Sequence, residues 1–138
     1  MLYVVDASAI APLAFADEAD RIDDDQRLLI VTSGLAAPAH WPVEVANMLL
    51  VALRRKRITD GQRVAATKHC RALSVKIDDE GANAIWSACF EIAAADGLTM
   101  YDAAYLELAR RKGCGLLTLD AALAKAARAR GVSTPLVP

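Results

Sequence analysis

Short apolar runs alternate along the chain with longer segments of helical periodicity. This alternation is typical of strands joined by helical crossovers, so we expect a mainly parallel sheet with helices on both faces. The apolar runs predict strands at residues 2–5, 35–37, 74–77, 116–119 and 133–137. Five such strands make a three-layer α/β/α sandwich.

The segments between these runs carry signals for helix ends. Thr59 with Gln62 and Thr99 with Asp102 have the spacing of a capping box, and Pro42 suits a first helical position. The periodicity predicts helices at 7–16, 18–31, 42–57, 60–72, 81–96, 101–112 and 121–130.

The predicted helix at 42–57 carries two apolar stripes rather than one. The first consists of Val45, Met48, Leu49 and Ala52, and the second of Val43, Ala46, Leu50 and Leu53. One stripe can cover the sheet. The other needs a partner, which is either the next helix or another chain.

Length and composition bound the class of protein. The 138 residues fit a single domain, residues 1–138, and a hydrophobic content of 55% with 24% charged residues indicates a globular chain. The net charge of −1 predicts no nucleic-acid or membrane partner from overall electrostatics, so any such partner must meet a local patch. No apolar stretch has the length of a membrane span, no signal peptide is evident, and the three cysteines match no disulfide framework, so we expect a cytoplasmic protein.

Four acidic residues lie where a parallel sheet would bring them together. Asp6 and Asp120 each follow a predicted strand directly, whereas Glu44 and Asp102 lie in the first turns of predicted helices. Each of them taken alone also has a purely structural explanation, because acids cap helix N-termini and interact favourably with the helix dipole. Their shared position at the carboxyl edge of the strands, where open α/β sheets bind ligands, favours a joint site.

A joint site of this kind requires a cation. Two carboxylates about 4 Å apart repel by roughly 4 kcal/mol at an effective dielectric constant near 20. All-oxygen ligation suits Mg²⁺ or Mn²⁺, and such an ion can activate water for phosphodiester hydrolysis. Ser8 and Thr118, each two residues from an acid, can supply hydroxyls that orient the ligands, or can serve as an ordinary cap and strand residue.

A basic run closes the helix predicted at 42–57. Its members are Arg54, Arg55, Lys56 and Arg57. Cations favour the negative end of a helix, so a solvated helix end explains the run. Arg54 and Arg55 can also contact RNA phosphates, in which case binding should weaken as salt rises.

Four motifs together resemble a known family. These are VVDASAI at 4–10, WPVEVANML at 41–49, LTMYDAAYLELA at 98–109 and LLTLDAALAKAA at 116–127. In this order and spacing the chain resembles a PIN-domain ribonuclease, and within that group the toxin of a VapBC-type toxin–antitoxin pair.

The resemblance implies a fold, a chemistry and partners. It implies a sheet of order 3-2-1-4-5, with Asp6, Glu44, Asp102 and Asp120 as the acidic metal-binding set and Ser8 and Thr118 as supporting hydroxyls. It further implies endoribonuclease activity with Mg²⁺ or Mn²⁺, a homodimer, and inhibition by a small VapB-like antitoxin.

Other functions stay open at this point. A phosphoacceptor receiver domain also gathers acids around Mg²⁺, but it needs adjacent acids after the first strand, and Ala7 follows Asp6. A binding module whose acids are only caps is a further alternative. A non-toxin PIN nuclease that processes RNA or cuts DNA is the third.

Overall fold

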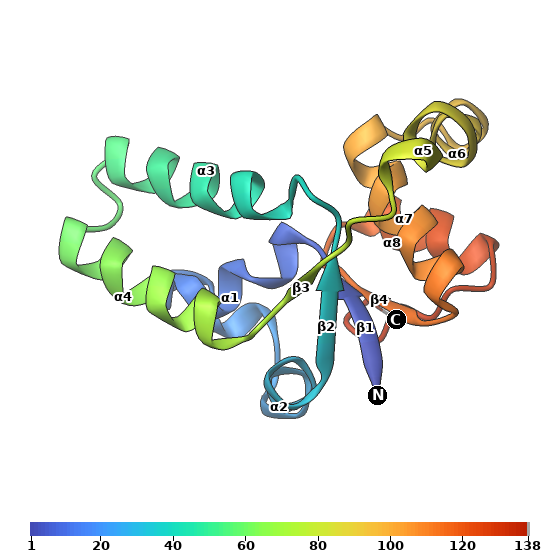
Figure 1. Ribbon diagram of the computed structural model, residues 1–138. Helices are drawn as coiled ribbons and strands as arrows, with labels where there is room; N and C mark the ends of the chain where they lie inside the picture. Colours follow the sequence, from blue (N-terminus) through green and yellow to red (C-terminus); the bar gives the residue numbers. More distant parts are fainter. Residues whose placement is uncertain (138) are drawn as a thin grey trace.

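The computed structural model describes residues 1–137, which form a parallel sheet with helices on both sides (Figure 1). The strands are β1 (Leu2–Val5), β2 (Gly34–Ala37), β3 (Lys76–Ile77) and β4 (Gly115–Leu117). Their order is β3-β2-β1-β4, and every neighbouring pair is parallel. The predicted α/β sandwich is therefore confirmed, with β1 and β4 side by side.

The predicted fifth strand at 133–137 is wrong. The chain does touch the edge of β4, since the N–H of Leu116 donates to the carbonyl of Ser133 at 2.9 Å. Pro135, however, has no N–H to donate to a ladder, and the segment from 133 to 137 adopts no strand. The sheet accordingly has four strands in the described part of the chain, rather than five.

Two predicted helices near the N-terminus have different bounds. The segment expected at 7–16 consists of a 3-10 turn η1 (Ala7–Ala9) and a short α1 (Ala11–Ala14). The helix expected at 18–31 is α2 (Asp24–Thr32), and it follows a second 3-10 segment, η2 (Ala16–Arg21). The later start has a local cause, because the side chains and backbone of Asp23 and Gln26 form a capping box.

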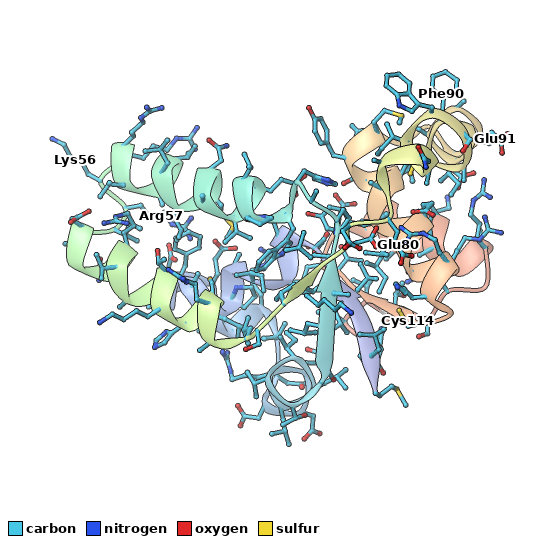
Figure 2. All side chains as sticks on the ribbon, in the orientation of Figure 1. Lys56, Arg57, Glu80, Phe90, Glu91 and Cys114 are labelled. Atoms are coloured by element: carbon cyan, nitrogen blue, oxygen red, sulfur yellow. The ribbon has the colours of Figure 1, made fainter. Side chains whose placement is uncertain are left out.

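Helices α3 (Trp41–Arg54) and α4 (Asp60–Ala72) form an arm that extends from the sheet (Figure 1). The capping box of Thr59 and Gln62 starts α4 as predicted. Lys56, in the left-handed conformation with φ 57°, lies at the tip of the arm (Figure 2). This backbone turn lets α4 run back along α3.

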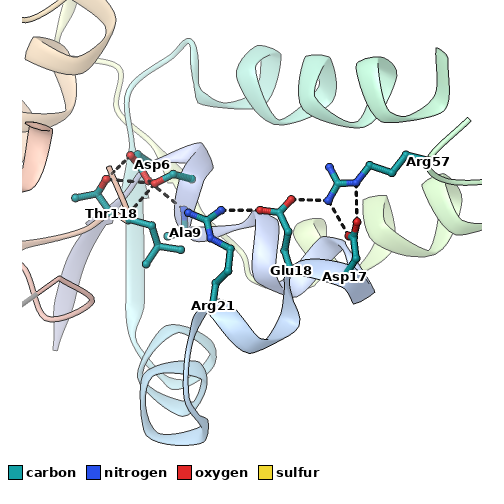
Figure 3. Close-up of polar contacts among 9 residues, drawn as sticks. Asp6, Ala9, Asp17, Glu18, Arg21, Arg57 and Thr118 are labelled. Carbon is teal, nitrogen blue, oxygen red and sulfur yellow. Dashed lines mark hydrogen bonds and ion pairs between the residues drawn. The ribbon is translucent and has the colours of Figure 1, made fainter. Parts of the chain in front are cut away.

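An ion-pair network ties this arm to η2 (Figure 3). Arg57 donates to Asp17 at 3.0 and 2.7 Å and to Glu18 at 2.6 Å. Its guanidinium carbon also lies 4.3 Å from the centre of the Phe15 ring. Because Arg21 donates to the same Glu18 at 2.6 Å, the connection between α3 and α4 is held against η2 by several charges and not by a single pair.

The two apolar stripes of α3 have different environments. Within the first stripe Val45, Leu49 and Ala52 are buried, as expected for the face that covers the core. Within the second, Val43 is 70% exposed and Leu50 is 38% exposed. Helix α4 therefore does not cover the second stripe in this chain.

The C-terminal half supplies the helices on the other side of the sheet (Figure 1). They are α5 (Ala82–Ala84), α6 (Phe90–Asp96), α7 (Met100–Lys112) and α8 (Ala121–Ala129), and a π-helical turn η3 (Ile85–Cys89) joins α5 to α6. Gly113 ends α7 in the left-handed conformation, with φ 64°, which a glycine adopts without strain. In residues 1–137 there is no helix with both the length and the apolarity needed to cross a bilayer.

Candidate active site

Asp6 lies at the carboxyl edge of the sheet, one residue beyond β1. Its backbone N–H still donates to the carbonyl of Leu117 in β4 at 3.2 Å, so the two central strands hold its position. The side chain is buried, with 5% of the residue exposed. The sequence thus brings a carboxylate into the interior at the point where β1 and β4 end.

Two hydroxyls and one backbone N–H satisfy the Asp6 carboxylate (Figure 3). Ser8 donates to Oδ1 at 2.7 Å and Thr118 donates to Oδ2 at 2.6 Å. The N–H of Ala9 donates to Oδ1 at 3.2 Å, so Asp6 also caps η1. Asp6 therefore caps η1 and at the same time has its carboxylate oriented by the two hydroxyls, so a capping role does not exclude a role as a metal ligand.

The same hydroxyls fix the turn between β4 and α8. Ser8 accepts from the N–H of Leu119 at 2.8 Å, and Thr118 accepts from the N–H of Asp120 at 3.0 Å. Asp120 in turn uses Oδ1 to accept from the N–H of Leu123 at 2.9 Å, which caps α8. Its Oδ2 has no hydrogen bond among the described residues and remains available to a ligand.

Asp102 lies in the first turn of α7, half-buried. Thr99 caps this helix by accepting from the N–H of Asp102 at 3.1 Å. The reciprocal half of the predicted capping box, in which the acid would bond the Thr99 N–H, is not formed in the described chain. The Asp102 carboxylate is consequently not committed to the cap.

Glu44 lies in the first turn of α3 and is held by residues from two elements. Tyr105 of α7 donates to its Oε2 at 2.9 Å. The Nε2 atom of His40 is 3.4 Å from Oε1, in an orientation that does not make a hydrogen bond. The hydrogen bond from Tyr105 ties the Glu44 carboxylate to α7, the helix that carries Asp102.

The electrostatics of the four acids are coupled. Burial raises the pKa of Asp6 to about 6, against the lowering effect of Ser8, Thr118 and the Ala9 N–H, and the charge of Asp102 raises it further. Burial also raises the pKa of Asp102, and so do the charges of Asp120 and Glu44. The structure thus brings the other three carboxylates within electrostatic reach of Asp102.

The chemistry of this donor set fits a divalent cation. It offers carboxylate and hydroxyl oxygens, which are the ligands that Mg²⁺ and Mn²⁺ prefer. Bringing carboxylates close enough to repel one another is unfavourable unless they take up protons or bind a positive ion. Across residues 1–137, no group of three or more His, Cys, Asp or Glu side chains already stands at the spacing of metal ligands.

Arg54 and Arg55 lie away from this edge. They are exposed at the far end of α3, ten and eleven residues beyond Glu44. At 1.5 Å per residue this is roughly 15 Å along the helix. The structure therefore does not bring these two arginines together with the four acids.

Two contributors to the site were missed in the sequence analysis. Tyr105 lies inside the third motif, three residues after Asp102, and helical periodicity places both on neighbouring positions of one face. The second is His40, whose ring packs edge-on against Tyr105, with centroids 4.9 Å apart. The spacing from Asp102 was the available signal for Tyr105, but its partner Glu44 is 61 residues away.

Comparison with known proteins identifies similar sequences. A family model described as PIN domain matches residues 3–129. A protein named Ribonuclease VapC3 from Pyrobaculum aerophilum is 32% identical over 125 residues, which span 91% of this chain and 94% of that protein. A protein of the same name from Mycobacterium tuberculosis is 33% identical over 123 residues, spanning 89% of this chain and 85% of that protein.

Solved structures share the architecture. The crystal structure of PAE2754 from Pyrobaculum aerophilum has a TM-score of 0.62 at 27% identity, covering 91% of this chain and 84% of that chain. Mycobacterium tuberculosis VapC20, described as a sarcin-ricin loop cleaving toxin, also has a TM-score of 0.62. It is 19% identical and covers 91% of this chain and 95% of its own, so this second likeness bears on the fold alone.

Proposed function

The chain belongs to the PIN-domain family, and from this premise we propose that it is a divalent-metal-dependent endoribonuclease of the VapC toxin type. The observation that carries the proposal is the electrostatically coupled acid set at the carboxyl edge of β1 and β4, in which Asp6 is buried and Glu44 and Asp102 are partly buried. Relatives named Ribonuclease VapC3 that match nearly the whole chain support the same reading. The family match also favours a nuclease over a phosphoacceptor domain or a cap-only binding module.

We assign Asp6, Glu44, Asp102 and Asp120 as the residues that hold Mg²⁺ or Mn²⁺, directly or through water. When bound, such an ion supplies a water of lowered pKa and positive charge beside the scissile phosphate. Ser8 and Thr118 keep both Asp6 oxygens oriented, as their hydrogen bonds of 2.7 and 2.6 Å indicate.

Two of the other three acids, Asp120 and Glu44, have hydrogen bonds of their own. Asp120 retains Oδ2 for a ligand while its Oδ1 caps α8. Glu44 is positioned through Tyr105.

A cleavage assay tests this function. Purified protein free of any antitoxin should cut RNA in Mn²⁺ and should stop in excess EDTA. Asp102→Asn should remove most of the activity, whereas Asp20→Asn, at an exposed acid of η2, should retain it. Equal cleavage by the two variants would overturn the assignment, and preference for DNA of the same sequence would replace an RNA nuclease with a DNA nuclease.

Arg54 and Arg55 are proposed to contact RNA phosphates at the arm's end. Replacing both with Gln should weaken binding and make the slope of log affinity against log salt shallower by about one to two, because each single-stranded phosphate contact contributes roughly 0.7. Filter binding in EDTA measures this without cleavage. The pair Lys68→Gln and Arg71→Gln, two exposed cations of α4, is the charge-matched control, and the same slope change in both pairs would contradict a specific contact.

The partners are proposed from the family and one exposed surface. The expected protein partners are a VapB-like antitoxin, which would inhibit the nuclease, and a second copy of the chain. The expected substrate is RNA, and the expected location is the cytoplasm. The second apolar stripe of α3, which includes Val43 and Leu50, supports an interface because this chain leaves it uncovered. A monomer mass across a light-scattering concentration series would exclude the homodimer.

A further inference from the structure

The buried side chain of Tyr105 donates a hydrogen bond to one of the four acids. Only 1% of it is exposed, in the middle of α7. Its hydroxyl donates to Glu44 Oε2 at 2.9 Å, and this is the hydrogen bond that the described chain gives to the Glu44 carboxylate. Leaving a buried hydroxyl without a partner is destabilising, so the Tyr105 hydroxyl depends on Glu44 as its acceptor.

The His40 ring lies against the other oxygen of the Glu44 carboxylate. The His40 ring packs edge-on against Tyr105, with centroids 4.9 Å apart, and against Tyr101, with centroids 5.5 Å apart. His40 Nε2 lies 3.4 Å from Glu44 Oε1. A Glu side chain has several rotatable bonds, and here one oxygen is bonded while the other faces a packed ring.

We propose that Tyr105 is the positioning residue for Glu44, holding its carboxylate in the orientation that faces Asp102 and hence the divalent cation. The inference rests on the proposed function and deepens it by adding a residue outside the acid set. It explains why α7 carries a tyrosine rather than a phenylalanine at a position that is otherwise part of the apolar core. Burial raises the pKa of Tyr105 and the charge of Glu44 raises it further, which keeps the hydroxyl a neutral donor.

Tyr105→Phe is a clean test because it removes one hydroxyl and keeps the buried ring. Mn²⁺ titration by calorimetry should show binding weakened about 10–100-fold, the usual effect of losing a residue that orients a metal ligand. The urea midpoint should stay close to wild type, since Glu44 is partly exposed and can bond water instead. RNA cleavage should fall through kcat, with KM for RNA changed little.

Tyr101→Phe is the matched control. Tyr101 packs on the same His40 but is 62% exposed, and its hydroxyl has no hydrogen-bond partner in the described chain. Its removal should leave Mn²⁺ affinity within twofold of wild type. Mn²⁺ binding by Tyr105→Phe that matches the control would overturn the proposal.

A double variant separates positioning from a general packing effect. In the Glu44→Ala background, Tyr105→Phe should cause no further loss of Mn²⁺ affinity, because the group it orients is gone. A further tenfold loss there would assign Tyr105 a merely structural role. Wild-type protein that binds Mn²⁺ but cuts no nucleic acid would sink the proposed function and leave this result standing, whereas no Mn²⁺ binding by wild type would overturn both.

Discussion

Asp6→Asn should abolish metal-dependent RNA cleavage while preserving the fold. Asp6 is the acid held most completely, by Ser8, Thr118 and the Ala9 N–H, at the junction of β1 and β4. Loss of a residue that only orients a ligand costs about 10–100-fold, and loss of the ligand itself should exceed this, so we expect a decrease of more than about 100-fold. Initial rates in saturating Mn²⁺ measure the effect.

The control for this variant is its folding. Asn has the size of Asp and can occupy the same buried position, so circular dichroism and the urea unfolding slope should match wild type. Retention of more than a tenth of wild-type activity by a folded Asp6→Asn protein would contradict a ligand role for Asp6.

Metal-free protein should become more stable as the pH falls from 7 toward about 4. The folded pKa of Asp6 is about 6, raised by burial from an ordinary value of 3.8. Between these values the folded state binds a proton that the unfolded state does not, so the free energy of unfolding rises as pH falls through 6 and levels off near 4. With about 1.4 kcal/mol for each pH unit between the two pKa values, the gain is at most about 3 kcal/mol.

Other acidic groups determine the pH below which the stability of the protein decreases again. Asp102 has a raised pKa and adds to the gain. Asp78 and Asp96 have pKa values lowered by Arg111 and Arg130, so their contribution is lost as the medium becomes more acidic than their ordinary range. The stability of the metal-free protein should therefore peak at mildly acidic pH.

Urea midpoints in EDTA at pH 7 and pH 5 measure this dependence. Asp6→Asn removes the buried charge, so it should be more stable than wild type at pH 7 and should show a smaller gain at pH 5. Equal pH dependence in both proteins would show that Asp6 is not the titrating group. A wild-type protein that loses stability between pH 7 and pH 5 would contradict the raised pKa itself.

Local signals in the sequence were sufficient for much of the fold. The apolar run at 2–5 matches β1, and the Thr59–Gln62 spacing predicts the start of α4 because a capping box is made entirely within four residues. The same spacing occurs at Asp23 and Gln26, but the helix was predicted at 18–31, so α2 was predicted to begin too early. The segment 133–137 has strand-like composition, yet forming a strand depends on a neighbour that Pro135 cannot bond.

The site shows the same division between local and distant causes. The positions of Asp6 and Asp120 follow from strand ends, and parallel topology then places them at one edge. The contact between Tyr105 and Glu44 joins α7 to α3 across 61 residues and left no periodic signal that names the pair. The exposure of Val43 likewise depends on how α4 packs against α3. Because both stripes of α3 are apolar, the sequence did not indicate which of them would stay exposed.

The location of the cation is the most direct test of the account. Crystals grown with Mn²⁺ should show an anomalous peak at the carboxyl edge of β1 and β4, with oxygens of Asp6 and Asp102 about 2.0–2.2 Å away, the spacing of a hard cation. Glu44 and Asp120 should contact the ion or its waters. A peak elsewhere on the molecule, or none in protein that cleaves RNA, would contradict a metal centre built from these four acids.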